Sequence, residues 1–331
     1  QADLVESGRA LLADPYLPEK ARKGQAEDIT PCLRCYECFG ETSKSETVKC
    51  TVNPTMGQQI SEKFPEKAPE YRKRILVAGG GPAGMEAAIT AAKRGHEVTL
   101  AEKSDRLGGN LHPAGSAFFK EDIRKFCDVM IRRTRQAGVK VLLNTEVTEA
   151  YIKEFSPDAL FVAIGSEELV PPIQGMDLPH VRMAVDAELH PEKLGKKVVI
   201  MGGGLVGSEA AVSFSREGRD CTIVEMKPEV AEEVNSFYRG GLLPEIEKAA
   251  AVYVNTKVKK IIPGGVVCEK DGKELILEAD SVVCALGFRA PYGRVDAFCS
   301  LVEEAYIIGD CSNVGQIYQA VNAAYYAAKR V

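Results

Sequence analysis

The chain has 331 residues, of which 45% are hydrophobic and 27% charged, as is typical of a globular protein with about two domains. Its 42 Lys and Arg against 47 Asp and Glu give a net charge of −5 without a basic block, so we expect neither nucleic acid nor a membrane as partner. The sequence begins at Gln1 without an apolar leader. We therefore expect no secretory signal and a cytoplasmic location.

The first 60 residues contain four of the ten cysteines: Cys32, Cys35, Cys38 and Cys50. A chain of this length needs no disulfide framework to fold, and nothing in it indicates secretion. Zinc sites usually divide their ligands between two separated pairs, whereas three cysteines in one run and a fourth further on are more typical of an iron–sulfur cluster. The spacing therefore favours iron–sulfur, with structural zinc and unrelated thiols left open.

A charged, proline-rich stretch over residues 61–74 predicts a linker. The apolar run that follows, 75–92, is long enough to suggest a membrane span. Its three consecutive glycines, Pro82 and Glu86 favour a buried strand that turns into a helix.

The turn between this strand and helix matches the pattern G-x-G-x-x-G at Gly79, Gly81 and Gly84. The first glycine permits a tight turn, the second lets the backbone approach a pyrophosphate, and the third lets the helix pack on the strand. The helix N-terminus offers N–H groups to the phosphates. Glu102 ends the next strand, where a carboxylate accepts hydrogen bonds from a ribose. We therefore predict a dinucleotide site.

The same pattern returns in the second half of the chain. Its glycines are Gly202, Gly204 and Gly207, and its acid is Glu225. Apolar strands follow each loop at nearly the same distance and end at Gly165 and Gly287. We interpret this as an internal duplication, which predicts an α/β fold with two Rossmann-like domains and parallel sheets. Glu225 favours NADH over NADPH, because a carboxylate repels a 2′-phosphate, although Lys227 weakens that preference.

These motifs resemble the two-dinucleotide-binding flavoprotein reductases. The resemblance implies FAD at the first loop and NAD(P)H at the second, with an FAD-binding domain over 75–190 and 288–331 and an NAD(H)-binding domain over 191–287. It also implies that Arg106, Gly109, Gly165, Gly287, Gly309 and Asp310 lie along the cofactors, with Asp310 binding the flavin ribityl chain. Glu209 matches a family Glu near the nicotinamide, a catalytic position. The alternative is an acid that stabilises the helix dipole, and the two readings stay open.

The cysteine segment and its surroundings resemble the old-yellow-enzyme-type NADH:flavin oxidoreductases that carry FAD and a 4Fe-4S cluster, such as 2,4-dienoyl-CoA reductase, enoate reductase and trimethylamine dehydrogenase. The resemblance makes Cys32, Cys35, Cys38 and Cys50 the cluster ligands. It makes Gly8 and Arg9 the end of a TIM barrel that holds an FMN phosphate, so residues 1–60 become barrel tail and cluster segment. We therefore expect Gln1 to be a cut through this barrel.

Together these features predict the electron-input portion of an NADH-dependent oxidoreductase. Electrons would pass from NADH to FAD and the 4Fe-4S cluster, and then, in the barrel, to FMN and an activated C=C bond of a small-molecule substrate. A stand-alone NADH:acceptor oxidoreductase that serves a partner protein, and a non-catalytic nucleotide-binding module, remain alternatives. The oligomeric state is left open, with a homo-oligomer as one alternative.

Overall fold

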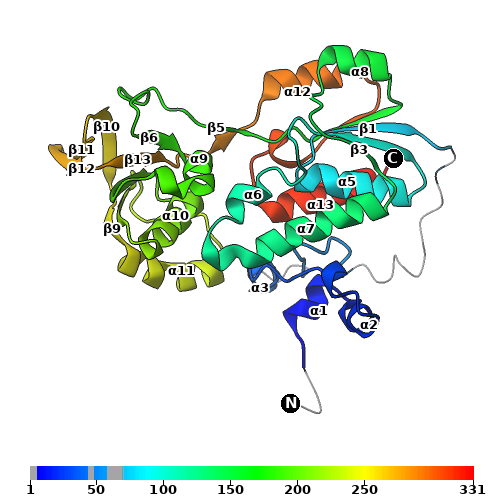
Figure 1. Cartoon of the computed structure of the whole chain (residues 1–331), viewed down its shortest axis with the longest axis horizontal. Coiled ribbons are helices and arrows are strands. Elements are labelled where there is room, and N and C mark those ends of the chain that lie inside the picture. The colour runs from blue at the N-terminus through cyan, green and yellow to red at the C-terminus, as the bar shows by residue number, and fades with distance from the viewer. Residues whose placement is uncertain (1–5, 44–47, 58–68, 70) are drawn as a thin grey trace. The chain divides into compact units, whose positions relative to one another are not determined.

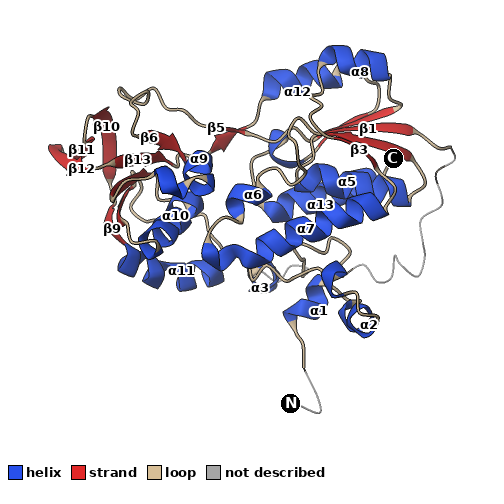
Figure 2. Cartoon of the chain, viewed as in Figure 1, coloured by secondary structure: helices blue, strands red, loops and turns tan. Residues whose placement is uncertain are grey.

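A computed structural model of the chain describes residues 6–43, 48–57, 69 and 71–331. The chain forms two compact units. The first comprises Gln1–His112, Asp122–Glu167 and Arg289–Val331, and the second comprises Pro113–Glu121 and Glu168–Phe288. Figure 1 follows the chain through both units, and Figure 2 shows that each combines helices with strands.

The first unit is built on a five-stranded sheet in the order β15-β4-β1-β2-β3, in which all neighbours are parallel. The strands are β1 (Arg74–Ala78), β2 (Glu97–Ala101), β3 (Lys140–Leu142), β4 (Ala159–Val162) and β15 (Ala305–Ile307). Alternate residues of β1 serve two cores: Ile75 and Val77 lie in one, Leu76 and Ala78 in the other. Both faces are therefore covered, as parallel sheets require.

Helices cover the two faces of this sheet unequally (Figure 1). One face carries α5 (Pro82–Lys93), α7 (Glu121–Gln136) and α13 (Ile317–Ala328), and the other carries α8 (Glu149–Phe155) and α12 (Tyr292–Cys299). The short helix η4 (Gly309–Cys311) completes this part of the unit, and α6 (Leu111–Ala114) spans the point where the chain first passes to the second unit.

The second unit repeats the arrangement with the sheet order β6-β13-β7-β8-β9, again parallel throughout. Its strands are β6 (Val181–Met183), β7 (Lys197–Met201), β8 (Asp220–Val224), β9 (Ala250–Tyr253) and β13 (Ser281–Cys284). One face packs on α9 (Ala184–Leu189), α10 (Leu205–Arg216) and α11 (Ser236–Ala249). The other packs on an antiparallel sheet of β10 (Thr256–Ile262), β11 (Gly265–Lys270) and β12 (Lys273–Glu278).

The predicted α/β fold with two Rossmann-like domains is confirmed, because each glycine loop joins the central strand of a five-stranded parallel sheet, β1 or β7, to the helix that follows it. The units differ from the expected domains at their edges. The second unit begins at Glu168 rather than 191, since β6 pairs with β13. It also includes Pro113–Glu121, which contains the short helix η2 (Phe118–Lys120). The short helix η3 (Pro191–Lys193) lies in the second unit too. The short strands β5 (Glu167–Glu168) and β14 (Phe288–Arg289) lie at two of the four points where the chain passes from one unit to the other.

The segment before the first sheet belongs to the first unit. It contains α1 (Arg9–Ala13), α2 (Leu17–Arg22), η1 (Ala26–Asp28) and α3 (Glu37–Ser43). Buried Asp14 organises it by accepting hydrogen bonds from Lys20 Nζ (2.7 Å) and the Thr30 amide (2.8 Å). Most of the linker expected over 61–74 lies outside the described residues, and β1 begins at Arg74. None of the described helices has the length and apolarity that crossing a membrane requires.

Candidate cofactor sites

The first glycine loop can be built only with glycine at two of its positions. Gly79 has a φ of +107°, and a Cβ there would lie 2.3 Å from the Ala163 carbonyl oxygen. A Cβ on Gly84 would lie 1.9 Å from the Gly79 carbonyl oxygen. Gly81, the N-cap of α5, is different, because a Cβ there would meet nothing within 4 Å. The space in front of this helix N-terminus is therefore open, as a pyrophosphate site requires.

Glu102 fixes the loop from the end of β2. Its Oε2 accepts from the Gly80 amide at 2.6 Å, and its Oε1 accepts from the Ser104 amide at 2.8 Å. The side chain is nearly buried. These bonds orient the carboxylate beside the loop, where its remaining lone pairs can accept from a ribose.

The second loop reproduces this geometry. A Cβ on Gly202 would lie 2.4 Å from the Ala285 carbonyl oxygen, and one on Gly207 would lie 2.0 Å from that of Gly202. Glu225 Oε2 accepts from the Gly203 amide at 2.6 Å, and its Oε1 accepts from the Lys227 amide at 2.8 Å. The duplication read from the sequence therefore extends to individual hydrogen bonds.

The loops differ at their central predicted glycine. A Cβ on Gly204 would lie 2.7 Å from Glu233 Oε1, and the same oxygen accepts from the Leu205 amide at 3.0 Å. A carboxylate thus lies at the N-terminus of α10, whereas the corresponding place at α5 is open.

Several predicted flavin-site residues gather around the N-terminus of α5. Gly309, with a φ of +68°, is so close that a Cβ would lie 2.8 Å from Ala83 Cβ, and a Cβ on Gly109 would lie 3.1 Å from Gly81 Cα. The neighbouring Asp310 accepts from Ser166 Oγ (3.1 Å) and from the Gly315 amide (3.3 Å). Burial raises the pKa of this carboxyl above its usual range.

Three other predicted positions are less tightly placed. Gly165 and Gly287 both have positive φ, at +73° and +96°, and space for a Cβ remains open at Gly165. Arg106 is exposed to solvent. The helix that follows Asp310 is α13, which begins at Ile317 and is capped reciprocally by Gln316 and Gln319.

Glu209 has partners that the sequence did not reveal. On α10, its Oε1 accepts from Lys120 Nζ and, at 2.5 Å, from Tyr238 Oη. The corresponding residue of the first loop, Glu86, is buried and forms an ion pair with Arg133 at 3.7 Å. Aligning the two loops would have identified Glu86 as its counterpart, but no local pattern marks Lys120 or Tyr238.

Another carboxyl in this region, that of Glu188, has a strongly raised pKa. Glu188, on α9, accepts from Ser116 Oγ at 2.6 Å. Burial raises its pKa to about 7, and the nearby charges of Glu209 and Glu217 act in the same direction. Lys120 and the Ser116 hydrogen bond oppose the shift without cancelling it.

The four clustered cysteines are half-buried free thiols. Arg34 and Tyr36, which flank Cys35, have positive φ of 56° and 63°, so this loop adopts a conformation that is costly for non-glycine residues. Cys32 and Cys50 pack against the core of the first unit. Burial raises the pKa of Cys35, of Cys38 and, to about 11, of Cys50.

The cysteine thiols influence one another electrostatically. Cys32 and Cys35 both raise the pKa of Cys38 and of Cys50, so the four side chains share one neighbourhood. Within the part of the chain that the structure describes, no three His, Cys, Asp or Glu side chains are placed to hold one metal ion. The four thiols are thus near neighbours without forming a compact single-ion site.

Gly8 and Arg9 lie beside this loop. Gly8 is the N-cap of α1, and the Arg9 guanidinium lies over the Tyr36 ring at 4.7 Å from its centroid. Arg9 Nη1 is buried without a hydrogen-bond partner among the described residues. A buried donor of this kind fits an acceptor that the described residues do not supply.

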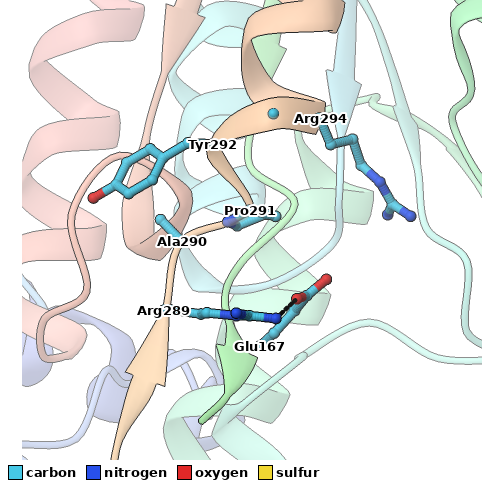
Figure 3. Close-up of a pocket in the computed structure, with 7 residues that line it drawn as sticks. Glu167, Arg289, Ala290, Pro291, Tyr292 and Arg294 are labelled. Carbon is cyan, nitrogen blue, oxygen red and sulfur yellow. Dashed lines mark ion pairs between the residues drawn. The ribbon is translucent and has the colours of Figure 1, made fainter. Parts of the chain in front are cut away.

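A pocket outside these sites lies at the start of α12 (Figure 3). Its lining includes Tyr292, Arg294 and an ion pair between Arg289 and Glu167 at 3.7 Å. None of the predicted site residues lines it, so the geometry gives no reason to include it in either dinucleotide site.

Comparison with known families gives two matches that together cover most of the chain. Residues 152–327 match the family described as pyridine nucleotide-disulphide oxidoreductase, and residues 74–159 match FAD dependent oxidoreductase. The first match covers more than half of the chain. The chain belongs to the pyridine nucleotide-disulphide oxidoreductase family. FAD and NAD(H) are the cofactors that these matches support.

Individual relatives extend the similarity to the whole chain. It is 35% identical over 100% of its length to cinnamate reductase from Clostridium sporogenes, covering 50% of that protein, and 35% identical to NADH oxidase from Thermoanaerobacter brockii, covering 52%. A solved structure of 2-naphthoyl-CoA reductase aligns with 98% of this chain and 50% of its own, at 32% identity and a TM-score of 0.91. The predicted resemblance to enoate-reductase-type flavoproteins is confirmed, and the chain spans about half the length of these relatives.

Proposed function

We propose that this family member is the electron-input portion of an NADH-dependent flavin and iron–sulfur oxidoreductase. NADH binds at the second loop, FAD at the first, and a 4Fe-4S cluster at Cys32, Cys35, Cys38 and Cys50. When bound, the flavin accepts hydride and passes electrons on singly. The observation that carries the proposal is the packing of Cys32 and Cys50 on the same core as the first glycine loop.

Each loop contributes the same functions to its dinucleotide. The open backbone at Gly81 admits the FAD pyrophosphate, and Glu102 and Glu225 orient the two riboses. Lys120 and Tyr238 hold Glu209, which we propose lies near the nicotinamide. These two partners fix the position of the Glu209 carboxylate, whereas an exposed acid on a helix would have no such partners.

The cysteine spacing favours a four-iron cluster over zinc, because three cysteines in one run and a fourth further on are more typical of an iron–sulfur cluster. The four thiols are also near neighbours, since Cys32 and Cys35 act electrostatically on Cys38 and Cys50. The buried donor of Arg9 fits an anion nearby, in agreement with the FMN phosphate implied by family resemblance.

The identity of the final electron acceptor has to be argued from the names of the relatives. Relatives are named cinnamate reductase and 2-naphthoyl-CoA reductase, which supports reduction of an activated C=C bond. The family resemblance implies FMN for this step, with the substrate contacts outside this chain. Another relative is named NADH oxidase, so transfer to a different acceptor is the second candidate. Comparing 2-enoates, their thioesters and dioxygen as oxidants for the protein that contains this chain distinguishes them.

The proposal is tested by anaerobic NADH titration of that protein. We expect bleaching of the oxidised flavin, followed by the paramagnetic signal of a reduced cluster, and iron and acid-labile sulfide near four per chain, the stoichiometry of a 4Fe-4S cluster. Cys50→Ser should lose iron and retain FAD. Cys299→Ser, a half-buried cysteine outside the segment, is the control and should retain both. Absence of flavin absorbance, or zinc in place of iron, contradicts the proposal.

A further inference from the structure

The two glycine loops differ in what lies in front of their helices, although the chain around them is duplicated. In the first, the Gly108 amide donates to the Gly80 carbonyl at 2.9 Å. In the second, the Ala231 amide donates to the Gly203 carbonyl at 2.7 Å, at the same spacing from the loop. The segments that follow each loop strand therefore correspond residue by residue.

This correspondence pairs neutral residues with acidic ones. Gly109 and Asn110 follow Gly108, whereas Glu232 and Glu233 follow Ala231. The first pair leaves the approach to Gly81 open. In the second pair, Glu233 Oε1 reaches the N-terminus of α10 and accepts from the Leu205 amide at 3.0 Å. The divergence thus introduces a carboxylate where the first loop has open space.

The helix N-termini differ in a matching way. The first residue of α5 is Pro82, which has no amide hydrogen, whereas the first residue of α10 is Leu205, whose amide needs an acceptor. A dinucleotide pyrophosphate and the Glu233 carboxylate are both anions suited to this position. They cannot occupy it together, because Glu233 Oε1 lies where even a Cβ on Gly204 would meet it at 2.7 Å.

We infer that Glu233 is an internal competitor for the NAD(H) pyrophosphate, which leaves the N-terminus of α10 when the nucleotide binds. The inference rests on the proposed NADH site at the second loop. The Glu233 side chain is exposed, so it can move into solvent without disrupting the packing of buried residues. The segment is also under local strain, because Ala231 has a φ of 51°, a left-handed conformation that is unfavourable for alanine.

The neighbouring acids do not share this position. Glu232 forms an ion pair with Lys227 at 3.4 Å, and Glu229 forms one with Arg239 at 2.6 Å. Glu232→Gln removes the same charge from the adjacent residue and is therefore a matched control for general electrostatic repulsion.

The test is calorimetric titration of the oxidised flavoprotein with ADP-ribose, which carries the pyrophosphate but cannot transfer hydride, and with NAD⁺. Glu233→Gln and Glu233→Asn, the latter copying the first loop, should each tighten both ligands roughly two- to fivefold, the range of an exposed acid at a helix N-terminus. Glu232→Gln should leave both affinities at the wild-type value.

Three results overturn the inference in distinguishable ways. Unchanged or weaker binding in both Glu233 variants, with wild-type binding intact, contradicts the competitor role and leaves the proposed NADH site standing. Equal tightening in Glu232→Gln assigns the effect to net charge and also contradicts it. If wild-type protein binds neither ADP-ribose nor NAD⁺, the proposed NADH site fails, and the inference fails with it.

Discussion

Asn322 of helix α13 holds the backbone of the last clustered cysteine: its Nδ2 donates to the Cys50 carbonyl oxygen at 3.1 Å and to the Tyr318 carbonyl oxygen at 3.0 Å. The side chain is nearly buried. The cysteine segment and the helix that follows Asp310 are therefore linked by a hydrogen bond as well as by apolar packing.

Asn322→Ala should make the cluster more labile without releasing the flavin. The substitution leaves the Cys50 carbonyl without this donor, which costs about 1 kcal/mol and corresponds to roughly fivefold faster loss of iron to a chelator. Iron release and flavin content are measured in parallel. Tyr326→Phe, on the exposed side of the same helix, should release iron at the wild-type rate. Equal release from Asn322→Ala and wild type would show that this bond does not support the cluster.

Gly84→Ala should reduce the stability of the protein, whereas Gly81→Ala should reduce its affinity for FAD. A Cβ on Gly84 meets a backbone oxygen at 1.9 Å, so we expect a loss of at least about 2 kcal/mol in the free energy of unfolding. A Cβ on Gly81 meets no protein atom within 4 Å, so that variant should fold with a change below about 1 kcal/mol yet bind FAD at least about tenfold more weakly. Urea unfolding and FAD reconstitution separate the two effects. Normal FAD affinity in Gly81→Ala would exclude the pyrophosphate from this space.

Glu102→Ala and Glu225→Ala should each impair the binding of a different cofactor. Each removes a carboxylate that accepts two backbone amides and, in the proposal, a ribose hydroxyl. Glu225→Ala should weaken ADP-ribose binding about tenfold or more while FAD content stays normal, and Glu102→Ala should lose FAD. The surface variant Glu229→Ala should change neither. NADH affinity untouched in Glu225→Ala would make the ribose assignment wrong.

Glu188 should make stability depend on pH. Its folded pKa of about 7 exceeds its usual value of 4.5, so the folded state binds this proton more tightly than the unfolded state does. The resulting stabilisation is complete below pH 4.5 and is lost as the pH rises through 7. Relative to Glu188→Gln, the wild type should therefore lose up to about 3 kcal/mol between pH 4.5 and 8.

Urea unfolding of both proteins at several pH values measures this difference. Glu192→Gln, at an exposed carboxyl nearby, should run parallel to the wild type over the whole range. Parallel curves for Glu188→Gln and wild type would mean that Glu188 is ionised in the folded protein with little cost.

The fold and the two loops could be predicted because their signals are local and occur twice. Gly79 and Gly202 mark strand-to-helix turns, and their equal spacing to Glu102 and Glu225 indicated that the two acids occupy equivalent positions. The partners of Glu209 could not be predicted in this way. Lys120 lies in the segment that leaves the first unit to join the second, and only the tertiary fold brings it to α10. Glu188 likewise depends on burial by residues distant in sequence.

The alternation of Glu233 and pyrophosphate at α10 has a consequence for turnover. FAD stays with a flavoprotein through many cycles, but NAD⁺ must depart after each hydride transfer. When NAD⁺ departs, the Leu205 amide can exchange its hydrogen bond to the pyrophosphate for one to the Glu233 carboxylate. The amide is then never left without an acceptor, which lowers the free-energy cost of dissociation. The same module, copied once and altered at Asn110 and Glu233, thereby suits one copy to a resident prosthetic group and the other to a substrate that exchanges.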